Sequence, residues 1–328
     1  MVGAVVVAGG RIVGEGYHHA AGEPHAEANA LAKARDAAPG ATLYVTLEPC
    51  VHHGRTPPCV DAVREAGISR VVAAMRDPDP RNDGCGIRAL RAAGVEVTEG
   101  VLREEAERLN AGFVSRIKRG RPHVLVKMAT TIDGRAAVKG RRYLSGKPAL
   151  REVHKLRDRF DAVLVGVGTV IADDPALTVR EVRGRDPLRV IVDTEARTPA
   201  NAKVVRSKDP QRTMIFVARD ADARRTNRLR DAGVLLATVP RADGGLDLGA
   251  VLRWLGEHGV NTVLSEAGPR VAGALIRAKL ADRLLLLISP VAGGDGPPAF
   301  DGVAGPAELH DLRVRRVGED VAIEGSLG

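Results

Sequence analysis

The sequence predicts an α/β protein built from two domains, and three observations lead to that fold class. The chain has 328 residues, long enough for about two domains that each bury a hydrophobic core. Short apolar runs alternate with helical segments through both halves, the pattern of sheets covered by helices. Between the halves, Ser115–Val124 combines a run of charges with Gly and Pro, as solvated boundaries do. We therefore expect one domain over residues 1–119 and another over residues 122–328.

The first domain is expected to form one sheet with helices laid upon it. Val2–Val7 and Arg11–Gly16 flank Gly9-Gly10, which predicts a hairpin. Three further strands are expected at Thr42–Thr46, Ser69–Met75 and Val95–Thr98. The helical segments of this domain are Ala26–Ala38, Cys59–Ala66, Ile87–Ala93 and Arg103–Arg116.

The second domain alternates strands and helices, which predicts a mainly parallel sheet with an antiparallel edge. Its expected strands are His123–Met128, Ala162–Gly166, Leu188–Asp193, Thr213–Ala218, Val234–Val239, Asn261–Ser265 and Leu284–Ser289. Its expected helices are Pro148–Arg157, Ala221–Asp231, Leu248–His258 and Arg270–Lys279. A closing hairpin is expected where Gly-Glu-Asp separates Leu312–Val317 from Val321–Leu327.

Charge and composition narrow the choice of partners. The net charge of +8 and the isoelectric point near 9.7 favour an anionic partner: nucleic acid, a membrane surface or a phosphorylated metabolite. Proteins that bind single strands stack the bases on aromatic side chains, and only 2% of this chain is aromatic. No apolar run approaches the length of a transmembrane helix. A phosphorylated small molecule is therefore expected, without nucleic acid or membrane.

Cysteine usage and the N-terminus favour a reducing, cytoplasmic compartment. The three cysteines, Cys50, Cys59 and Cys85, are too few for a disulfide framework. The N-terminus has an apolar run, but no basic segment precedes it and no cleavage site follows it, so it does not resemble a signal peptide.

The stretch from Pro24 to Cys59 carries the most specific chemistry. One imidazole, His25, and two thiols, Cys50 and Cys59, offer zinc three protein ligands and leave a fourth position open, as in catalytic zinc sites. Glu27 follows His25 by two residues and would carry protons. Residues two apart cannot share a helix face. We therefore expect His25 and Glu27 to converge over the first turn of a helix, where the dipole supports negative charge.

Other candidate residues have plainer interpretations. His52 and His53 lie between the two cysteines and are expected to face substrate or solvent, because the ligand set is already complete. Cys85 is expected to be a small buried or loop residue. For His123 and His154 a structural or surface role is expected.

The motif H-x-E followed by P-C and a second Cys is the signature of zinc deaminases, in which the Glu is a general acid/base rather than a ligand. Eight residues, rather than two, separate the cysteines here. With that longer loop, EPCVHHGRTPPC, GEPHAE and AGFVSRIKRGRP resemble the deaminase half of the bifunctional deaminase/reductase family of riboflavin biosynthesis. The resemblance implies a cytidine-deaminase-like three-layer domain over residues 1–119, with Zn²⁺ on His25, Cys50 and Cys59 and with Glu27 as the catalytic proton carrier.

The same resemblance implies the substrate. It is a diaminopyrimidinone that bears a phosphoribosylamino group and loses one ring amino group as ammonia. Family members carry a leading helix and a PNP segment before the first strand, whereas this sequence begins at Met1 directly before it. We expect either a functional start upstream or an impaired deaminase half.

The second domain departs from the usual dinucleotide fingerprint. Gly166–Thr169 follows a strand, but Ile171 stands where the third Gly of G-x-G-x-x-G belongs. Glu266–Gly273 places a Gly-Pro turn between a strand and a helix N-terminus, the arrangement that receives phosphate. From the residues alone, a tight turn without a ligand is an equally good interpretation.

Four motifs of this domain, VKMATTIDGRAA, GTVIADDPALTVR, RVIVDT and SEAGPRVAGALI, resemble the reductase half of the same family. The resemblance implies a dihydrofolate-reductase-like α/β domain in which NADPH reduces the ribosyl group to ribityl, with Lys127 near the chemistry. The implied cofactor contacts are Ala129, Tyr143, Thr169, Asp173, Thr194 and Gly268, and the implied substrate contacts are Arg157, Leu177, Arg180 and Glu266. Without the resemblance, Arg157 and Arg180 could line a solvated face.

The sequence thus predicts a cytoplasmic bifunctional enzyme that first deaminates and then reduces a phosphorylated pyrimidine. We expect it to be a homo-oligomer. Two alternatives stay open. One is a reductase with an impaired or vestigial deaminase half. The other is a nucleic-acid-binding base deaminase, which the net charge of +8 favours.

Overall fold

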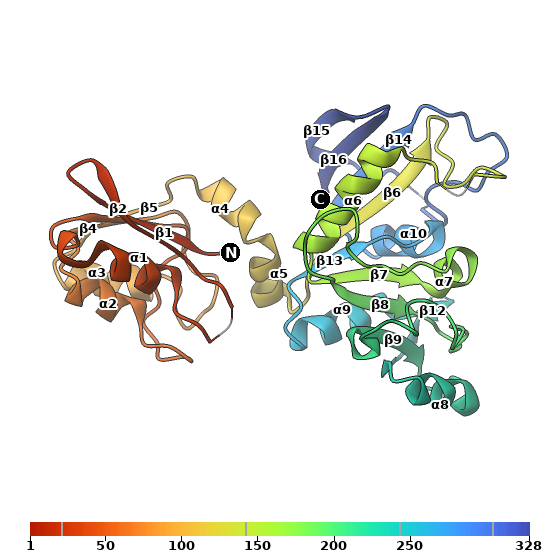
Figure 1. Ribbon diagram of the computed structural model, residues 1–328, viewed down its shortest axis with the longest axis horizontal. Coiled ribbons are helices and arrows are strands. Elements are labelled where there is room, and N and C mark those ends of the chain that lie inside the picture. Colours follow the sequence, from red (N-terminus) through yellow and green to blue (C-terminus); the bar gives the residue numbers. More distant parts are fainter. Residues whose placement is uncertain (21, 142, 243, 304) are drawn as a thin grey trace. The chain divides into compact units, whose positions relative to one another are not determined.

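The computed structural model describes residues 1–20, 22–141, 143–242, 244–303 and 305–328. The chain forms two compact units, Met1–Arg119 and Gly120–Gly328 (Figure 1). Each unit has its own sheet and its own hydrophobic core. None of the helices within the described residues has the length and hydropathy that crossing a membrane requires.

The first unit is built on a five-stranded sheet with the order β2-β1-β3-β4-β5. β1 (Gly3–Ala8) forms the predicted hairpin with β2 (Arg11–Tyr17) and also pairs antiparallel with β3 (Thr42–Val45). β4 (Arg70–Ala73) and β5 (Glu96–Glu99) continue the sheet parallel to β3. Parallel neighbours need a crossover connection, and a helix supplies each one.

Three helices pack on one face of this sheet: α1 (Ala26–Ala34), α2 (Cys59–Glu65) and α3 (Cys85–Ala92). α1 lies against β2, where a Cβ on Gly16 would overlap the backbone of α1. Gly14 has the same relation to α1. The two glycines therefore allow the start of α1, with His25 and Glu27, to approach the sheet.

The prediction of one helix over Arg103–Arg116 is wrong. Two helices occupy this region, α4 (Arg103–Leu109) and α5 (Ala111–Arg119), and Asn110 separates them. The buried amide of Asn110 donates to the carbonyl of Ala106 (3.2 Å). Such local bonds compete with the continuation of a helix.

The predicted helix Ala26–Ala38 is also too long. α1 ends at Ala34 and a short 3-10 helix, η1 (Arg35–Ala37), follows it. Arg35 has a φ of 46°, a conformation in which an α-helix of L-residues cannot continue.

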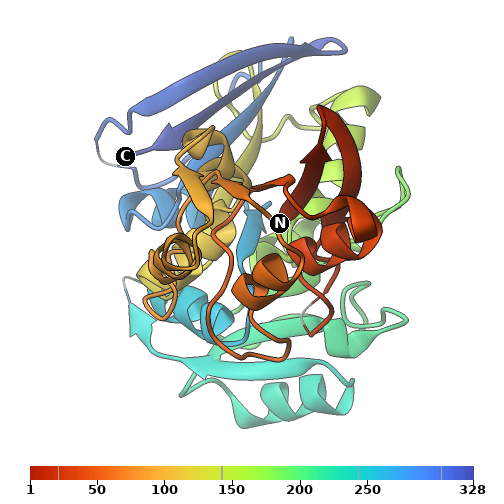
Figure 2. The ribbon, with the colours of Figure 1, turned by 90° about the vertical axis from the view of Figure 1, so that its left-hand side faces the viewer.

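The second unit is built on a nine-stranded sheet with the order β10-β9-β8-β7-β13-β6-β14-β16-β15. The strands from β10 to β14 run parallel and the last two antiparallel, which confirms the predicted antiparallel edge. The β15–β16 ribbon is blue at the top of Figures 1 and 2. The strands are β6 (His123–Thr131), β7 (Ala162–Gly166), β8 (Leu188–Val192), β9 (Thr213–Ala218), β10 (Leu235–Val239), β13 (Thr262–Ser265), β14 (Arg283–Ser289), β15 (Leu309–Val317) and β16 (Asp320–Leu327).

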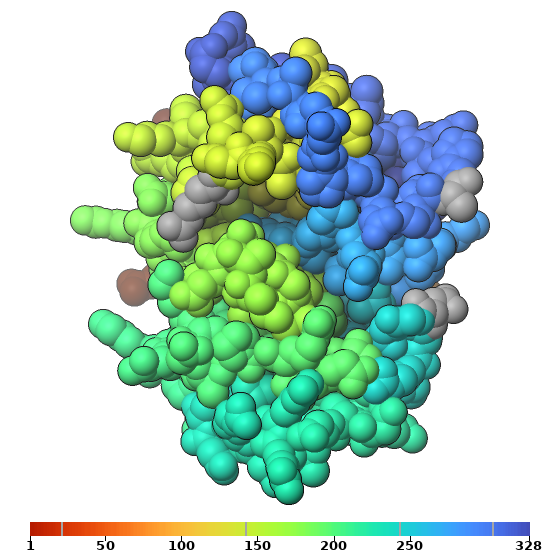
Figure 3. Space-filling model, turned by 90° about the vertical axis from the view of Figure 1, so that its right-hand side faces the viewer, coloured from red at the N-terminus to blue at the C-terminus, as the bar shows by residue number. Residues whose placement is uncertain are grey.

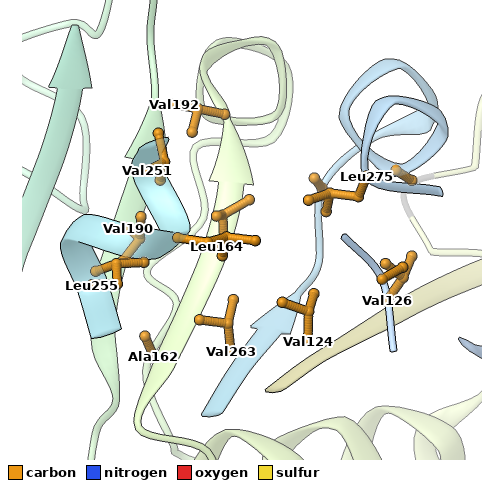
Figure 4. Packing of buried hydrophobic residues seen from close by; sticks show 14 of the residues in the cluster. Val124, Val126, Ala162, Leu164, Val190, Val192, Val251, Leu255, Val263 and Leu275 are labelled. Atoms are coloured by element: carbon orange, nitrogen blue, oxygen red, sulfur yellow. The ribbon is translucent and has the colours of Figure 1, made fainter. Parts of the chain in front are cut away.

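Helices cover both faces of this sheet. α9 and α10 pack on one face, where Leu255 and Leu275 meet Leu164 and Val263 of the strands (Figure 4). α6, α7 and α8 pack on the opposite face. The helices are α6 (Lys147–Arg159), α7 (Val167–Asp173), α8 (Ala223–Asp231), α9 (Leu248–Glu257) and α10 (Pro269–Arg277), with the 3-10 helix η2 (Pro210–Arg212) before β9.

The helix α7 of the second unit was not predicted. α7 begins directly after β7. It is rich in β-branched residues, which are typical of strands, so the sequence did not indicate a helix here. Val167 and Val170 anchor this helix in the core. The 3-10 helix η2 and the short antiparallel pair of β11 (Arg241–Ala242) and β12 (Gly245–Leu246) were not predicted either.

The carboxyl ends of the parallel strands β6, β7, β8 and β13 lie at one edge of the sheet. In open parallel sheets, ligands bind outside this edge. Figure 3 views the second unit from this side and shows a hollow between segments coloured yellow and yellow-green. We therefore expect the reductase site at this edge of the sheet.

Candidate active sites

Three potential zinc ligands converge at the ends of two helices in the first unit. His25 immediately precedes α1, Cys59 begins α2, and Cys50 lies on the connection between β3 and α2. Nδ1 of His25 lies 3.1 Å from Sγ of Cys59 and 3.6 Å from Sγ of Cys50. All three atoms lie within 4.8 Å of one another. One ion can reach all three at ordinary zinc–ligand distances, so the donors and their spacing fit zinc.

Cys50 is favoured as a thiolate. The backbone N–H of Cys59 donates to Sγ of Cys50 (3.4 Å). A hydrogen bond from the Cys59 thiol to the same sulfur lowers the pKa of Cys50 to about 4 and raises the pKa of Cys59. Contact with Cys50 also raises the pKa of His25. Because thiolates are the ligating form of Cys, the surroundings of Cys50 favour its binding to a metal.

The second ring nitrogen of His25 is engaged as well. Nε2 lies 3.2 Å from the hydroxyl oxygen of Thr56. A metal-ligating His commonly uses its other nitrogen for such a contact, which fixes the orientation of the ring. The sequence analysis missed Thr56, because its contact with His25 depends on how the loop between the cysteines folds.

Glu27 lies beside these residues in the first turn of α1 and is only 3% exposed. The structure thus places His25 and Glu27 at one helix end. Burial raises the pKa of the Glu27 carboxyl to about 7. A carboxyl with a pKa near neutrality can both accept and donate a proton.

Basic side chains lie near the cluster. The ring of His18 meets that of His25 edge-on, with centroids 5.3 Å apart, and Arg55 passes beside Gly22. His53 is exposed and His52 is partly buried, and neither belongs to the group of converging ligand atoms. The surroundings of the cluster are therefore suited to an anionic substrate.

The third cysteine, Cys85, lies apart from this group. It begins α3 and is partly buried. The guanidinium of Arg88 donates to its sulfur (3.0 Å).

In the second unit, Lys127, Arg157 and Glu266 come together. Arg157, on α6, donates to the Glu266 carboxylate from Nε (2.6 Å) and from Nη2 (2.8 Å). Glu266 follows β13, and Lys127 lies on the adjacent strand β6. Burial lowers the pKa of Lys127. Burial opposes ionisation of Glu266, but Arg157 outweighs it and holds the pKa of Glu266 below its ordinary value.

Hydrogen bonds hold the segment that follows α7 against α6. Nη1 of Arg157 donates to the carbonyl of Thr178 (3.0 Å), and the backbone N–H of Arg180 donates to Nδ1 of His154 (3.2 Å). The side chain of Arg180 is exposed. Leu177 is 2% exposed and its side chain lies in the core, so only its backbone can meet a substrate.

Two of the residues assigned to the cofactor lie side by side. A Cβ on Gly268 would stand 3.6 Å from the hydroxyl oxygen of Thr169. Gly268 immediately precedes α10, and Thr169 lies in the first turn of α7. Together they form the junction of two helix N-termini at the carboxyl edge of the sheet.

The other assigned residues are spread along this edge and its rim. Ala129 lies on β6 and Thr194 follows β8. Asp173, the last residue of α7, and Tyr143 are exposed. Asp174 ends α7 with a φ of 41°, so the Asp-Asp-Pro segment is a helix C-terminus.

Fold and sites together define a class of protein: an enzyme with a zinc-deaminase-type unit followed by a reductase-type α/β unit. Comparison with protein families agrees with this class. The cytidine and deoxycytidylate deaminase zinc-binding region matches residues 1–75. The RibD C-terminal domain matches residues 122–323.

Whole relatives match over nearly the full chain. The riboflavin biosynthesis protein RibD of Escherichia coli (strain K12) is 40% identical, covering 98% of this chain and 92% of that protein. RibD of Aquifex aeolicus (strain VF5) is 41% identical, covering 98% and 90%. Among solved structures, Acinetobacter baumannii RibD, form 1, superposes with a TM-score of 0.89 at 33% identity, covering 100% and 92%. A diaminohydroxyphosphoribosylaminopyrimidine deaminase/5-amino-6-(5-phosphoribosylamino)uracil reductase from Thermotoga maritima superposes with a TM-score of 0.86 at 35% identity, covering 100% and 92%.

The chain belongs to the RibD family. It is a bifunctional deaminase and reductase of riboflavin biosynthesis, and its cofactors are Zn²⁺ and NADPH. The predicted fold class is confirmed: a cytidine-deaminase-like unit precedes a dihydrofolate-reductase-like α/β unit. The comparisons give no support to a vestigial deaminase half or to a base deaminase of nucleic acids.

Proposed function

We propose that residues 1–119 deaminate 2,5-diamino-6-(5-phosphoribosylamino)pyrimidin-4-one and that residues 122–328 then reduce its ribosyl group to ribityl. The convergence of His25, Cys50 and Cys59 beside a buried carboxyl carries the first half of the proposal. The Thermotoga maritima relative is named for both reactions.

In the deaminase site, His25, Cys50 and Cys59 would hold the metal and Glu27 would move the protons. Zinc, when bound, lowers the pKa of a water molecule so that it can attack the ring carbon bearing the amino group. Glu27 accepts the proton that this water loses. It delivers this proton to the ring nitrogen. It then takes the second proton from the hydroxyl group added to the ring carbon and delivers it to the amino group, which leaves as ammonia. The pKa of about 7 suits Glu27 to transfer in both directions.

The substrate phosphate needs a positively charged partner. His18 lies against His25, and Arg55 lies on the loop that carries Thr56. Guanidinium groups bind phosphate by charge-assisted hydrogen bonds, and an imidazole ring can donate an N–H to it. We therefore place the phosphoribosyl end of the substrate beside His18 and Arg55.

In the reductase site, Lys127, Arg157 and Glu266 would position the sugar. NADPH, when bound, supplies the hydride that reduces the first carbon of the ribosyl group. The Arg157–Glu266 pair is rigid because two parallel hydrogen bonds join it. Lys127, whose pKa burial lowers, would donate a proton to the ring oxygen as the ribose opens. Exposed Arg180 and the backbone of Leu177 would meet the phosphate end.

The cofactor would lie along the carboxyl edge of the second sheet. The adjoining starts of α7 and α10, with Thr169 and Gly268, present backbone N–H groups that suit its phosphates. Ala129 and Thr194 would line the cofactor along the strands, and Asp173 and Tyr143 would contact it at the rim.

We further propose that the enzyme acts in the cytoplasm, as a homo-oligomer, without nucleic acid or membrane. Its three cysteines form no disulfide, which suits a reducing compartment.

The exposed Leu312 and Val314 lie on β15, the edge strand of the second sheet, and such an edge favours pairing with another chain. Light scattering would give the oligomeric state.

Two variants test the division of labour between the units. Glu27→Gln should reduce ammonia release at least about hundredfold while NADPH oxidation with deaminated substrate stays at the wild-type rate. Glu266→Gln should reduce NADPH oxidation to a similar extent and leave ammonia release at the wild-type rate. Glu23 is exposed and lies in the bend before α1, and Glu23→Gln is the control that should leave both rates unchanged. Loss of both activities in either variant would contradict the assignment of one site to each unit.

A further inference from the structure

A buried polar network lies directly behind the zinc ligand Cys50. Its members are Glu48, Asp77 and Asn82, which are 3%, 8% and 0% exposed. Asp77 and Asn82 belong to residues 77–87, which comprise most of the connection between β4 and α3 and the first turn of α3. We call this segment the backing loop. None of the three side chains belongs to the group of converging ligand atoms.

Glu48 lies between β3 and Cys50, and its side chain holds the backing loop against this segment. One carboxylate oxygen, Oε2, accepts from the backbone N–H groups of Asp77 (3.1 Å) and Gly84 (2.9 Å). The other, Oε1, accepts from the N–H of Ile87 (3.1 Å). Three backbone donors satisfy this buried carboxylate, and all three belong to the backing loop.

Asn82 holds the chain on both sides of Cys50. Its Oδ1 accepts from the backbone N–H of Val51 (3.1 Å), and its Nδ2 donates to the carbonyl of Pro49 (3.5 Å). Nδ2 also donates to Oδ2 of Asp77 (3.2 Å). The peptide groups that flank the ligand are therefore both bonded to one side chain.

The packing of the loop gives a second, independent sign of close contact. Gly86 has no room for a side chain, because a Cβ there would overlap the carbonyl oxygen of Pro49 and crowd Glu48. The backing loop thus touches the ligand-bearing segment through its backbone as well as through its polar side chains.

We propose that Glu48 and Asn82 are positioning residues of the zinc site, which fix the backbone of Cys50 so that its sulfur faces His25 and Cys59. The inference rests on the zinc role given to these three residues under the proposed function. Outer contacts of this kind set the affinity of a metal site, and losing one typically costs about 10- to 100-fold in metal binding. Both side chains are buried, so we assign to neither a substrate contact nor a proton transfer.

The chain offers a swap that separates positioning from general stability. Asn82→Asp keeps an acceptor for Val51 but sets a second carboxylate against Asp77, so the two repel. Adding Asp77→Asn restores a donor between positions 77 and 82, because the new amide can donate to the new carboxylate. Oδ1 of residue 77 still accepts from the N–H of Asp79, as it does in the wild type (2.9 Å).

The experiment measures zinc affinity by competition with a chromophoric chelator on the full-length protein. Glu48→Gln and Asn82→Asp should each bind zinc about 10- to 100-fold more weakly. The double variant Asp77→Asn/Asn82→Asp should recover part of the loss, because it restores the bond between positions 77 and 82 but not the bond to the Pro49 carbonyl. The matched controls are exposed: Glu65→Gln and Asn227→Asp should keep wild-type affinity. Because zinc is spectroscopically silent, cobalt substitution reports geometry. The thiolate-to-cobalt absorption should shift in the two single variants and move back toward the wild-type position in the double one.

The outcomes are distinct. Folded single variants with wild-type zinc affinity and cobalt spectra would overturn the inference, as would a double variant no better than Asn82→Asp. A lower melting temperature with unchanged zinc affinity would mean a structural role only, which also overturns it. If Asn82→Asp does not fold, Glu48→Gln and its control decide alone. Wild-type protein that binds no zinc would refute the proposed function itself, and the inference with it.

Discussion

At the scale of single residues, the zinc site depends on which atom of each ligand faces the others. His25 directs Nδ1 to the two sulfurs and Nε2 to the hydroxyl of Thr56. An imidazole ring without its outer partner is free to turn, and both tautomers become available to it. Thr56 therefore helps to select the nitrogen that binds the metal.

Thr56→Val keeps the shape of the side chain and removes its hydroxyl. We expect zinc affinity to fall about tenfold and ammonia release at limiting zinc to fall with it, because His25 loses the contact that orients its ring. Thr56→Ser is the matched control and should behave as the wild type. Equal zinc affinity in Thr56→Val and Thr56→Ser, measured by chelator competition, would refute the role of the hydroxyl.

At the scale of elements, the deaminase site depends on how closely α1 approaches β2. The approach is possible because Gly14 and Gly16 carry no Cβ. His25 and Glu27 are at the start of α1, so any displacement of this helix moves a ligand and the proton carrier together.

Gly16→Ala should therefore damage both stability and the site. We expect a loss of about 1–3 kcal/mol in the free energy of unfolding, the usual cost of overpacking, together with weaker zinc binding. Gly3→Ala, on the adjacent strand, is the control: its nearest neighbour would be the carbonyl of Gly16 at 3.9 Å. Urea denaturation followed by far-ultraviolet circular dichroism, with zinc content, checks both effects, and equal results for the two variants would contradict this account.

In the second unit, a buried ion pair joins the start of β6 to the start of β14. Asp282 accepts from Nη1 and Nη2 of Arg121 (both 2.9 Å) and from the backbone N–H of Val124 (2.7 Å). His123 lies beside the same carboxylate (3.6 Å). Burial opposes the charge of Asp282, but these partners outweigh it and hold its pKa below the ordinary value of 3.8.

A depressed folded-state pKa stabilises the fold above the unfolded-state pKa, and this contribution is lost as the pH falls through the folded value. The second unit should therefore lose stability below about pH 4, and Asp282→Asn should lack this part of the pH dependence. At neutral pH the variant should be about 3–5 kcal/mol less stable, because Arg121 is left buried without its carboxylate. Urea unfolding followed by the fluorescence of Trp254, the single Trp, measures this unit, with exposed Asp231→Asn as control. Identical pH profiles for Asp282→Asn and the wild type would exclude the pair as the cause.

At the scale of the whole molecule, the chain carries one site in each of two units with separate cores. Each unit places its site where its own architecture favours it. In the first, the cluster forms at the starts of two helices, and in the second, the candidate residues gather at the carboxyl ends of parallel strands. The order of the units along the chain matches the order of the two reactions.

Much of this arrangement could be predicted from the sequence, because it depends on short-range patterns. His25, Cys50 and Cys59 are recognisable by residue type and spacing, and apolar runs mark the strands. α7 was missed because it is rich in β-branched residues and its helical state depends on Val167 and Val170 packing in the core. The contacts of Asn82 were missed for another reason: it lies 31 positions after Val51 in the chain, and no local pattern indicates such a pair.

The central claim, two consecutive reactions on one chain, is tested most directly by following ammonia release and NADPH oxidation together. The wild-type protein, with zinc, NADPH and the diaminopyrimidinone substrate, should release ammonia first and then oxidise one equivalent of NADPH for each ammonia. NADPH oxidation without prior release of ammonia, or ammonia release that no oxidation follows, would contradict it.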